Sequence, residues 1–170
     1  MNKTEHNFSI LVAENKDKIY RICCYYLSRD EDRKDLYQET LLNLWKAFKS
    51  FREESAFSTW AFRITVNTAL QFISKEKRIN ISRKNYSNRG MNQDLSHEDK
   101  SMTPEQNEIE ILHKSILQLP LIDMIIISLV LEEVPSKDIA KIIGLTDANV
   151  RVRIHRAKST LKRIIEGGES

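Results

Sequence analysis

The strongest constraint on the fold of this chain lies in its C-terminal third, where a glycine separates two apolar helical repeats. The first repeat follows Ser136, which can cap a helix, and stops at Gly144, which suits a left-handed C-terminal cap. The second repeat follows Thr146, a good N-cap, and its apolar positions recur at steps of four and three residues. These positions are Val150, Ile154, Ala157, Leu161 and Ile164. The segment therefore predicts a helix, a tight turn and a second helix.

The side of this second helix that faces away from the apolar stripe is basic. At about 100° per residue, it carries Ala148, Val152, His155, Arg156, Ser159 and Arg163, flanked by Arg151, Arg153, Lys158 and Lys162. The whole chain has a net charge of only +3, so a nucleic-acid surface requires such clustering. A helix of this kind after a tight turn is typical of one that enters the DNA major groove. Taken alone, the segment is also compatible with a basic helix that is merely solvated.

The chain as a whole divides into two modules. Residues 80–103 are rich in Asn, Ser and charge and poor in periodic apolar positions, which is typical of a linker. Residues 104–170 are predicted to form four helices. A capping box that begins at Thr103 marks the start of the first one. The apolar face of this first helix is expected to hold Ile109, Leu112, Ile116 and Leu119. Residues 1–79 contain no glycine and no persistent alternation, so they too predict helices. We therefore predict an all-α fold: two small helical domains, 1–79 and 104–170, joined by a flexible linker, the second ending in a helix-turn-helix.

A helix predicted from about Arg33 to Lys49 has two unlike faces. Its core stripe is expected to hold Tyr37, Leu41, Leu44 and Phe48. The other side presents Asp35, Gln38, Glu39, Leu42 and Lys46, with Trp45 at the border. A large apolar side chain such as Leu42 among acids and amides favours a protein-binding face. A single exposed leucine is also compatible with an ordinary surface.

The next helix is predicted to begin at Trp60, with a core stripe of Phe62, Val66, Ala69 and Ile73. Its reverse face carries Trp60, Ile64, Asn67, Gln71 and Arg78, with Arg63 and Lys75 nearby. Such aromatic, amide and cationic groups in a row suit stacking on unpaired bases and holding their backbone. The preceding polar loop contains Phe51, Arg52 and Phe57, which suit a base pocket. The two phenylalanines and Trp60 fit equally well as a plug between helices, so both interpretations stay open.

The composition argues against a membrane, a disulfide and a metal. The longest apolar run, residues 124–131, is far shorter than the roughly 20 residues of a membrane helix. No apolar N-terminal stretch follows a basic start, so a cytoplasmic protein is expected. Cys23 and Cys24 are adjacent on a predicted helix and diverge by about 100°, which favours thiols in or near the core. The four histidines show no metal-ligand spacing, and no cofactor is expected.

Two blocks of this sequence resemble one known family. The first is DLYQETLLNLWKAFKSFREESAFSTWAFRITVNTALQFISKEKR, residues 35–78. It resembles the most recognisable region of bacterial extracytoplasmic-function (ECF) sigma factors, the minimal branch of the sigma-70 family. The second is LQLPLIDMIIISLVLEEVPSKDIAKIIGLTDANVRVRIHRAKSTLK, residues 117–162, which resembles the other domain of that family. The two blocks stand in the right order, and the resemblance covers about residues 8–166.

The resemblance implies a promoter-specificity subunit. Such a protein binds core RNA polymerase, recognises the minus-35 element of promoter DNA through its C-terminal domain and helps melt the minus-10 element through its N-terminal one. It is not itself an enzyme, so no catalytic residue, cofactor or small-molecule substrate is expected. An anti-sigma factor, membrane-anchored for many relatives, is a further expected partner.

Carried over by position, the resemblance implies three functional surfaces. Core polymerase is expected to be bound by Asp35, Gln38, Glu39, Leu42, Trp45 and Lys46. Minus-10 DNA is expected to be bound and melted by Phe51, Arg52, Ser55, Phe57, Ser58, Trp60, Arg63, Asn67, Gln71, Lys75 and Arg78. Minus-35 DNA is expected to be bound by Thr146, Ala148, Asn149, Arg151, Val152, Arg153, His155, Arg156, Lys158, Ser159 and Lys162.

Three features depart from the family pattern. Glu53 and Glu54 follow the Phe-Arg pair, where the family usually has glycine. Ala148 and Asn149 stand where Gly-Thr is common, and Val152 replaces a residue that is often polar. Because Ala148 and Val152 can contact DNA bases only through apolar groups, we expect them to contact thymine methyl groups.

Two other functions are compatible with parts of the sequence. A freestanding helix-turn-helix regulator would need only the C-terminal helices, and the Leu42 and Trp45 patch argues against it. A protein that sequesters polymerase or another sigma factor would need only the N-terminal helices. The outward row of Trp60, Asn67 and Gln71 argues against that alternative.

Overall fold

The computed structural model describes residues 3–86 and 103–167 of the 170-residue chain, with side chains described for residues 6–78 and 103–167. These residues form helices and connecting turns, with no strand among them. The predicted all-α class is therefore confirmed. In chain order the helices are α1 (Lys3–Tyr25), α2 (Asp30–Phe48), α3 (Phe57–Tyr86), α4 (Pro104–Ile116), α5 (Leu121–Leu131), α6 (Ser136–Ile143) and α7 (Asp147–Gly167).

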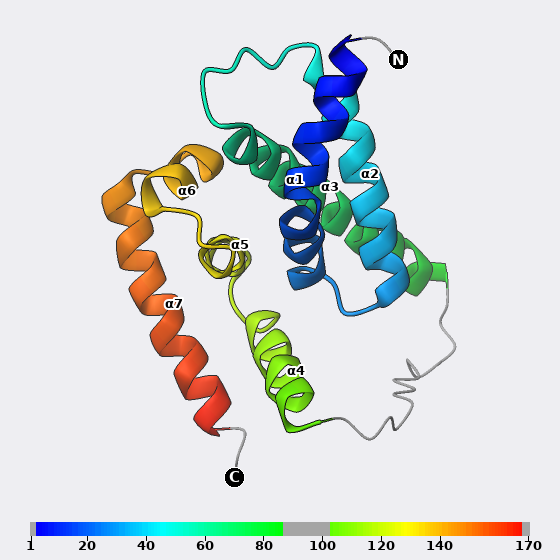
Figure 1. Cartoon of the computed structure of the whole chain (residues 1–170). Coiled ribbons are helices and arrows are strands. Elements are labelled where there is room, and N and C mark those ends of the chain that lie inside the picture. The colour runs from blue at the N-terminus through cyan, green and yellow to red at the C-terminus, as the bar shows by residue number, and fades with distance from the viewer. Residues whose placement is uncertain (1–2, 87–102, 168–170) are drawn as a thin grey trace.

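Helices α1, α2 and α3 pack on one another as a bundle (Figure 1). Helix α2 begins three residues before its predicted start, because Asp30, Glu31 and Asp32 supply the negative charge that a helix N-terminus favours. Its predicted core stripe was half right, since Tyr37 and Leu41 are only half-buried. In the first half of the helix the buried positions lie one residue earlier than predicted. The buried residues of α2 are Leu36, Thr40, Leu44 and Phe48.

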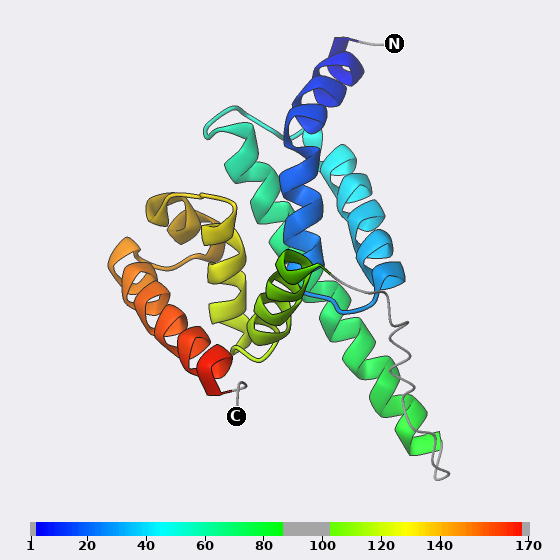
Figure 2. The same ribbon diagram turned by 60° about the horizontal axis from the view of Figure 1, so that its bottom comes forward.

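Helix α3 is longer than the sequence predicted. It starts at Phe57, buries Phe62, Val66 and Ala69 as expected, and runs to Tyr86. Seven residues of the predicted linker are therefore helical, because polar side chains without glycine or proline do not by themselves end a helix. Figure 2 shows the end of α3 extending past the other helices. The rest of the predicted linker, residues 87–102, lies outside the described residues.

Helices α4 to α7 form the second half of the molecule. The predicted capping box at Thr103 is present, with its hydroxyl accepting from the Gln106 amide and the Gln106 side chain accepting from the Thr103 amide. The predicted apolar face of α4 is wrong at its first turns. Ile109 is 67 % exposed, whereas Ile116 and Leu119 are buried, because no described helix covers this side of α4 at Ile109.

The turn between α6 and α7 has the predicted geometry with one difference. Gly144 adopts the left-handed conformation, with φ of +73°, and the Thr146 hydroxyl caps α7 by accepting from the Asn149 amide at 3.3 Å. The prediction that Ser136 caps α6 is wrong, because Pro135 occupies the N-cap position. The Ser136 hydroxyl instead donates to the Asp147 carboxylate at 2.5 Å. That hydrogen bond ties the start of α6 to the start of α7.

The two halves of the chain pack against each other. Helix α5 lies between α1 and α7, and α6 lies beside the start of α3 (Figure 1). At the contact between α1 and α5, the buried hydroxyls of Tyr26 and Ser128 are 2.8 Å apart and share a hydrogen bond. The apolar residues around them belong to one continuous core cluster that spans both halves.

Candidate functional site

The face of α2 that was predicted to bind polymerase is exposed from Asp35 to Lys46. Leu42 and Trp45 are 51 % and 41 % exposed, which is high for large apolar side chains. The Trp45 ring is held edge-on against Phe8 of α1, with ring centroids 5.1 Å apart. The face brings together every residue predicted for polymerase binding, Asp35, Gln38, Glu39, Leu42, Trp45 and Lys46.

The aromatic side chains between α2 and α3 form a cluster around Phe48. Phe51 lies 4.9 Å from Trp60 and 5.7 Å from Phe57, measured between ring centroids. Phe57 is only 8 % exposed, whereas Phe51 and Trp60 are half-buried. The packing supports the interpretation as a plug for Phe57, while Phe51 and Trp60 keep part of their surface open to a partner.

The loop before α3 carries an unusual backbone conformation. Glu53 has φ of +57°, in the left-handed region that costs a side-chain-bearing residue about 1 kcal/mol. This is the position after the Phe-Arg pair, where glycine is usual in the family that the sequence resembles. Glycine adopts this conformation without that cost. Around it Arg52 is exposed, and Ser55 and Ser58 are half-buried.

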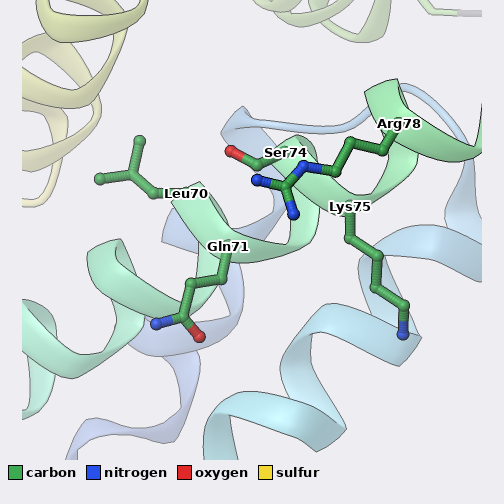
Figure 3. A pocket seen from close by; sticks show the side chains of 5 residues that line it. All are labelled: Leu70, Gln71, Ser74, Lys75 and Arg78. Carbon is green, nitrogen blue, oxygen red and sulfur yellow. The ribbon is translucent and has the colours of Figure 1, made fainter. Parts of the chain in front are cut away.

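A row of polar side chains follows the exposed face of α3. Arg63, Asn67, Gln71, Lys75 and Arg78 are all exposed. The last three line a shallow hollow of about 440 Å³. In Figure 3, Gln71 and Lys75 project to the same side of the helix and Arg78 folds back along it.

Two further residues line this hollow, and neither was predicted as a site residue from the sequence. They are Leu70 and Ser74, each one residue before a predicted DNA-contacting position. Their spacing of four residues was visible, but nothing in the residue types pointed to a ligand. The signal that could have found them is the four-residue step from Leu70 to Ser74 to Arg78, which places both residues on one helical face with that cation.

The face of α7 opposite the core is open to solvent. Its apolar stripe packs inward as predicted, with Val150, Ala157 and Leu161 buried. Val152 is 49 % exposed in the middle of the basic side. The residues predicted for minus-35 DNA that are exposed are Thr146, Ala148, Asn149, Arg151, Val152, His155, Arg156, Lys158, Ser159 and Lys162.

The arginines of α7 are not equivalent. Arg153 is half-buried, and its guanidinium donates to the Asp123 carboxylate of α5 at 2.7 Å. Arg151 is exposed and pairs at 2.8 Å with Asp147, whose other oxygen accepts from Ser136. Arg153 therefore anchors α7 to α5, whereas Arg151 is oriented at the surface.

The remaining predictions concern metals, thiols and membranes. Burial raises the pKa of the Cys23 thiol to about 12, and Cys23 and Cys24 are both free, as the sequence predicted. Within residues 6–78 and 103–167, no group of three or more His, Cys, Asp or Glu side chains is arranged to hold a metal ion. Across the described helices, none is both long and apolar enough to span a bilayer.

Comparison with known proteins matches both halves of the chain. Residues 11–79 match the family Sigma-70 region 2, and residues 109–161 match Sigma-70, region 4. The ECF RNA polymerase sigma-E factor of Haemophilus influenzae is 30 % identical over 166 residues, covering 94 % of this chain and 87 % of the relative. The factor of the same description from Escherichia coli K12 is 28 % identical over 167 residues, covering 94 % and 86 %.

Solved structures share the fold. RpoE, a sigma factor solved in complex with the anti-sigma factor NepR from Bartonella quintana, matches with a TM-score of 0.72 and 19 % identity, over 94 % of this chain and 97 % of that one. CnrH, solved in complex with the cytosolic domain of CnrY, matches with a TM-score of 0.70 and 18 % identity, over 96 % and 90 %.

Proposed function

Because this chain belongs to the extracytoplasmic-function (ECF) RNA polymerase sigma factors of the sigma-70 family, we propose which of its exposed surfaces binds core polymerase and which bind promoter DNA. Members are transcription initiation factors: they direct core RNA polymerase to specific promoters and start transcription there. The observation that carries the assignment is that one chain holds two different exposed faces. One is the α2 face with Leu42 at its centre, and the other is the basic face of α7.

We propose that the α2 face binds core polymerase. Leu42 supplies an apolar anchor, and the carboxylates and amides around it form a polar rim, which is the usual anatomy of a protein interface. Trp45 is already fixed against Phe8, so little side-chain freedom is lost when a partner covers it.

The start and exposed face of α3 are proposed to act on the minus-10 element. Phe51 and Trp60 offer half-exposed rings for stacking, and Asn67 and Gln71 offer amides for base edges. Lys75 and Arg78 beside the hollow in Figure 3 provide positive charge for the backbone of the opened strand. A flipped base needs such a stacking surface to offset the few kcal/mol that unstacking costs.

Helix α7 is proposed to read the minus-35 element in the major groove. Its exposed cations contact phosphates and base edges, and the positive end of the helix dipole at its start suits a phosphate. Ala148 and Val152 lie between them and present only apolar groups. Replacing thymine by uracil throughout this element should weaken promoter binding, and unchanged affinity would remove the thymine-methyl hypothesis.

The family also suggests where and with whom the protein acts. We infer that it works in the cytoplasm beside the polymerase, without catalytic residues, cofactor or small-molecule substrate of its own. We further propose an anti-sigma factor as a regulator, because the sigma factor RpoE was solved with one. We also propose a region 2-like domain over residues 1–79 and a region 4-like domain over residues 104–170, joined by a linker. The family matches at residues 11–79 and 109–161 support this division, and the helical end of α3 at Tyr86 shortens the predicted linker.

Leu42→Asp is the variant that tests the polymerase surface. A buried carboxylate at the centre of an interface is costly, so binding to purified core polymerase should fall at least tenfold, roughly 1.4 kcal/mol or more. Circular dichroism should stay that of the wild type, because Leu42 is exposed. Loss of helical signal would place Leu42 in the core and contradict the assignment. Tight promoter binding by the protein without polymerase would instead favour the freestanding regulator.

A further inference from the structure

Helix α7 begins with a carboxylate whose two oxygens are both engaged. Asp147 is the first residue of α7, and its side chain is 24 % exposed. One carboxylate oxygen accepts from the Ser136 hydroxyl of α6 at 2.5 Å. The other oxygen lies 2.8 Å from Nη2 of Arg151, four residues further along α7. The Asp147 carboxylate therefore links α6 to a cation on the surface of α7.

The hydrogen bond from Ser136 sets this ion pair apart from an ordinary pair on one helix. Asp138 and Lys141 form an ordinary pair, 3.0 Å apart, within the single helix α6. Surface pairs of that kind stabilise little, because both side chains stay free to move. The Asp147 carboxylate is instead held from a second helix, and a held carboxylate restricts the guanidinium that pairs with it. Arg151 is thus restricted although its side chain is 68 % exposed.

The ion pair also sets the direction of the Arg151 side chain. Side chains of an α-helix lean toward its N-terminus, and pairing with Asp147 holds the guanidinium beside the first turn of α7. In a helix-turn-helix, the N-terminal residues of the second helix contact base edges in the major groove. Phosphates fix the position of the helix but carry no sequence information directly. The pair therefore places the guanidinium where sequence is read.

The guanidinium has donors left for a base while Asp147 holds it. Arginine carries five N–H donors in a planar fork, and the ion pair is made through Nη2. The remaining donors suit O6 and N7 of guanine, which are the acceptors that arginine binds most often in the major groove. Immobilising a long side chain on binding costs conformational free energy. Asp147 lowers that cost, because Arg151 is already restricted in the free protein.

We propose that Asp147, held by Ser136, is a positioning residue that presents Arg151 to a guanine of the minus-35 element. Asp147 itself contacts no DNA and acts through the arginine. The inference rests on the proposed function, because it takes α7 to be the helix that reads minus-35 DNA. It adds Asp147 and Ser136, which lie outside the predicted DNA-binding set, to the residues that determine promoter selectivity.

Promoter binding by the polymerase holoenzyme tests the inference on a promoter found by run-off transcription. Fluorescence anisotropy gives the affinity for this promoter and for versions with each minus-35 base pair changed in turn. The ratio of the two affinities is the discrimination at that base pair. Arg151→Ala should lower the discrimination at one G·C pair about fivefold or more. A uniform loss of affinity for all versions would mean that Arg151 contacts phosphate only, and would overturn the proposal.

Asp147→Asn is the central variant. Asparagine still accepts from Ser136 but carries no charge for Arg151, so discrimination at the same G·C pair should fall about two- to tenfold. Asp138→Asn is the matched control, because it removes the same charge from the first turn of α6 and breaks the pair with Lys141. Its discrimination should equal that of the wild type. Unchanged discrimination in Asp147→Asn, or an equal fall in Asp138→Asn, would overturn the proposal.

Discrimination separates positioning from a simple change of charge. Removing an acid near DNA strengthens binding to every sequence, so the absolute affinity of Asp147→Asn does not decide the question. Arg156 is exposed and lies outside the Asp147 pair, so the discrimination that Arg156→Ala removes should be unchanged in Asp147→Asn. A fall at that base pair too would mean that Asp147 positions the whole helix, which would overturn its assignment to Arg151.

A second variant keeps the test decisive if Asp147→Asn loses helical signal in circular dichroism. Ser136→Ala leaves the charge of Asp147 in place but frees its carboxylate, so discrimination at the Arg151 base pair should fall by a smaller factor. Full discrimination in a folded Ser136→Ala variant would overturn the role of the Ser136 hydrogen bond. Unchanged promoter binding in both Arg151→Ala and Arg156→Ala would contradict the proposed function of α7, and the inference with it.

Discussion

Helix α7, proposed to read minus-35 DNA, and the segment between α2 and α3, proposed to act on minus-10 DNA, present their side chains in opposite ways. On α7 the basic and apolar side chains stand free on one face of a regular helix, ready for a rigid duplex groove. Between α2 and α3 the aromatic side chains pack against one another, and Phe57 is part of the core. On the proposed assignment, the surface for duplex DNA is complete before binding, whereas the surface for melted DNA includes residues that also stabilise the fold.

Phe57→Ala should produce the largest effect, a loss of folding stability that a substitution on the exposed face of α7 should not cause. Removing a buried phenylalanine costs about 3–5 kcal/mol, whereas Val152→Ala on the exposed α7 face should change stability by less than about 0.5 kcal/mol. Urea unfolding followed by circular dichroism measures both. If Phe57→Ala were as stable as the wild type but inactive in transcription, Phe57 would be a base-binding residue and the contrast would fail.

Arg156→Ala and Arg153→Ala sharpen the account of α7 itself. Arg156 is exposed and should contribute about 1–3 kcal/mol of promoter binding by the holoenzyme. Arg153 is engaged with Asp123, so its removal should mainly lower the free energy of unfolding, by up to about 1 kcal/mol for a partly exposed pair. Fluorescence anisotropy with a labelled promoter and thermal unfolding distinguish the two. Equal losses of DNA affinity would mean that the Asp123 pair breaks on DNA.

Glu53→Gly addresses the loop before α3 and has the smallest expected effect. Glycine adopts the left-handed conformation at φ of +57° without strain, so the free energy of unfolding should rise by about 1 kcal/mol. Glu54→Gly is the neighbouring control and should be neutral or destabilising, because its backbone is not in that region. A destabilised Glu53→Gly variant would show that the carboxylate itself supports the loop.

Local signals in the sequence predicted much of this fold. The capping box at Thr103 and the left-handed Gly144 each depend on residues within a few positions of one another. The same holds for the exposed face of α7, because a regular helix fixes the direction of every side chain. The exposure of Leu42 followed from its helical position for the same reason.

Contacts between distant parts of the chain were not predictable from local patterns. Arg153 looked like the other cations of α7, and only the fold brings Asp123, thirty positions away, to its guanidinium. Arg21 pairs with Glu132, 111 positions away, and neither residue type signals the other. In the segment predicted as a loop, Phe51 and Phe57 followed no helical period that could decide between core and surface. Tertiary packing decided each of these cases.

Transcription from genomic fragments by purified core polymerase, with and without this protein, tests the central claim most directly. The account predicts discrete run-off transcripts that appear only when the chain is present and disappear with Leu42→Asp. It would be contradicted if the chain bound polymerase and yet no fragment gave a specific transcript, because the protein would then sequester polymerase rather than direct it to promoters.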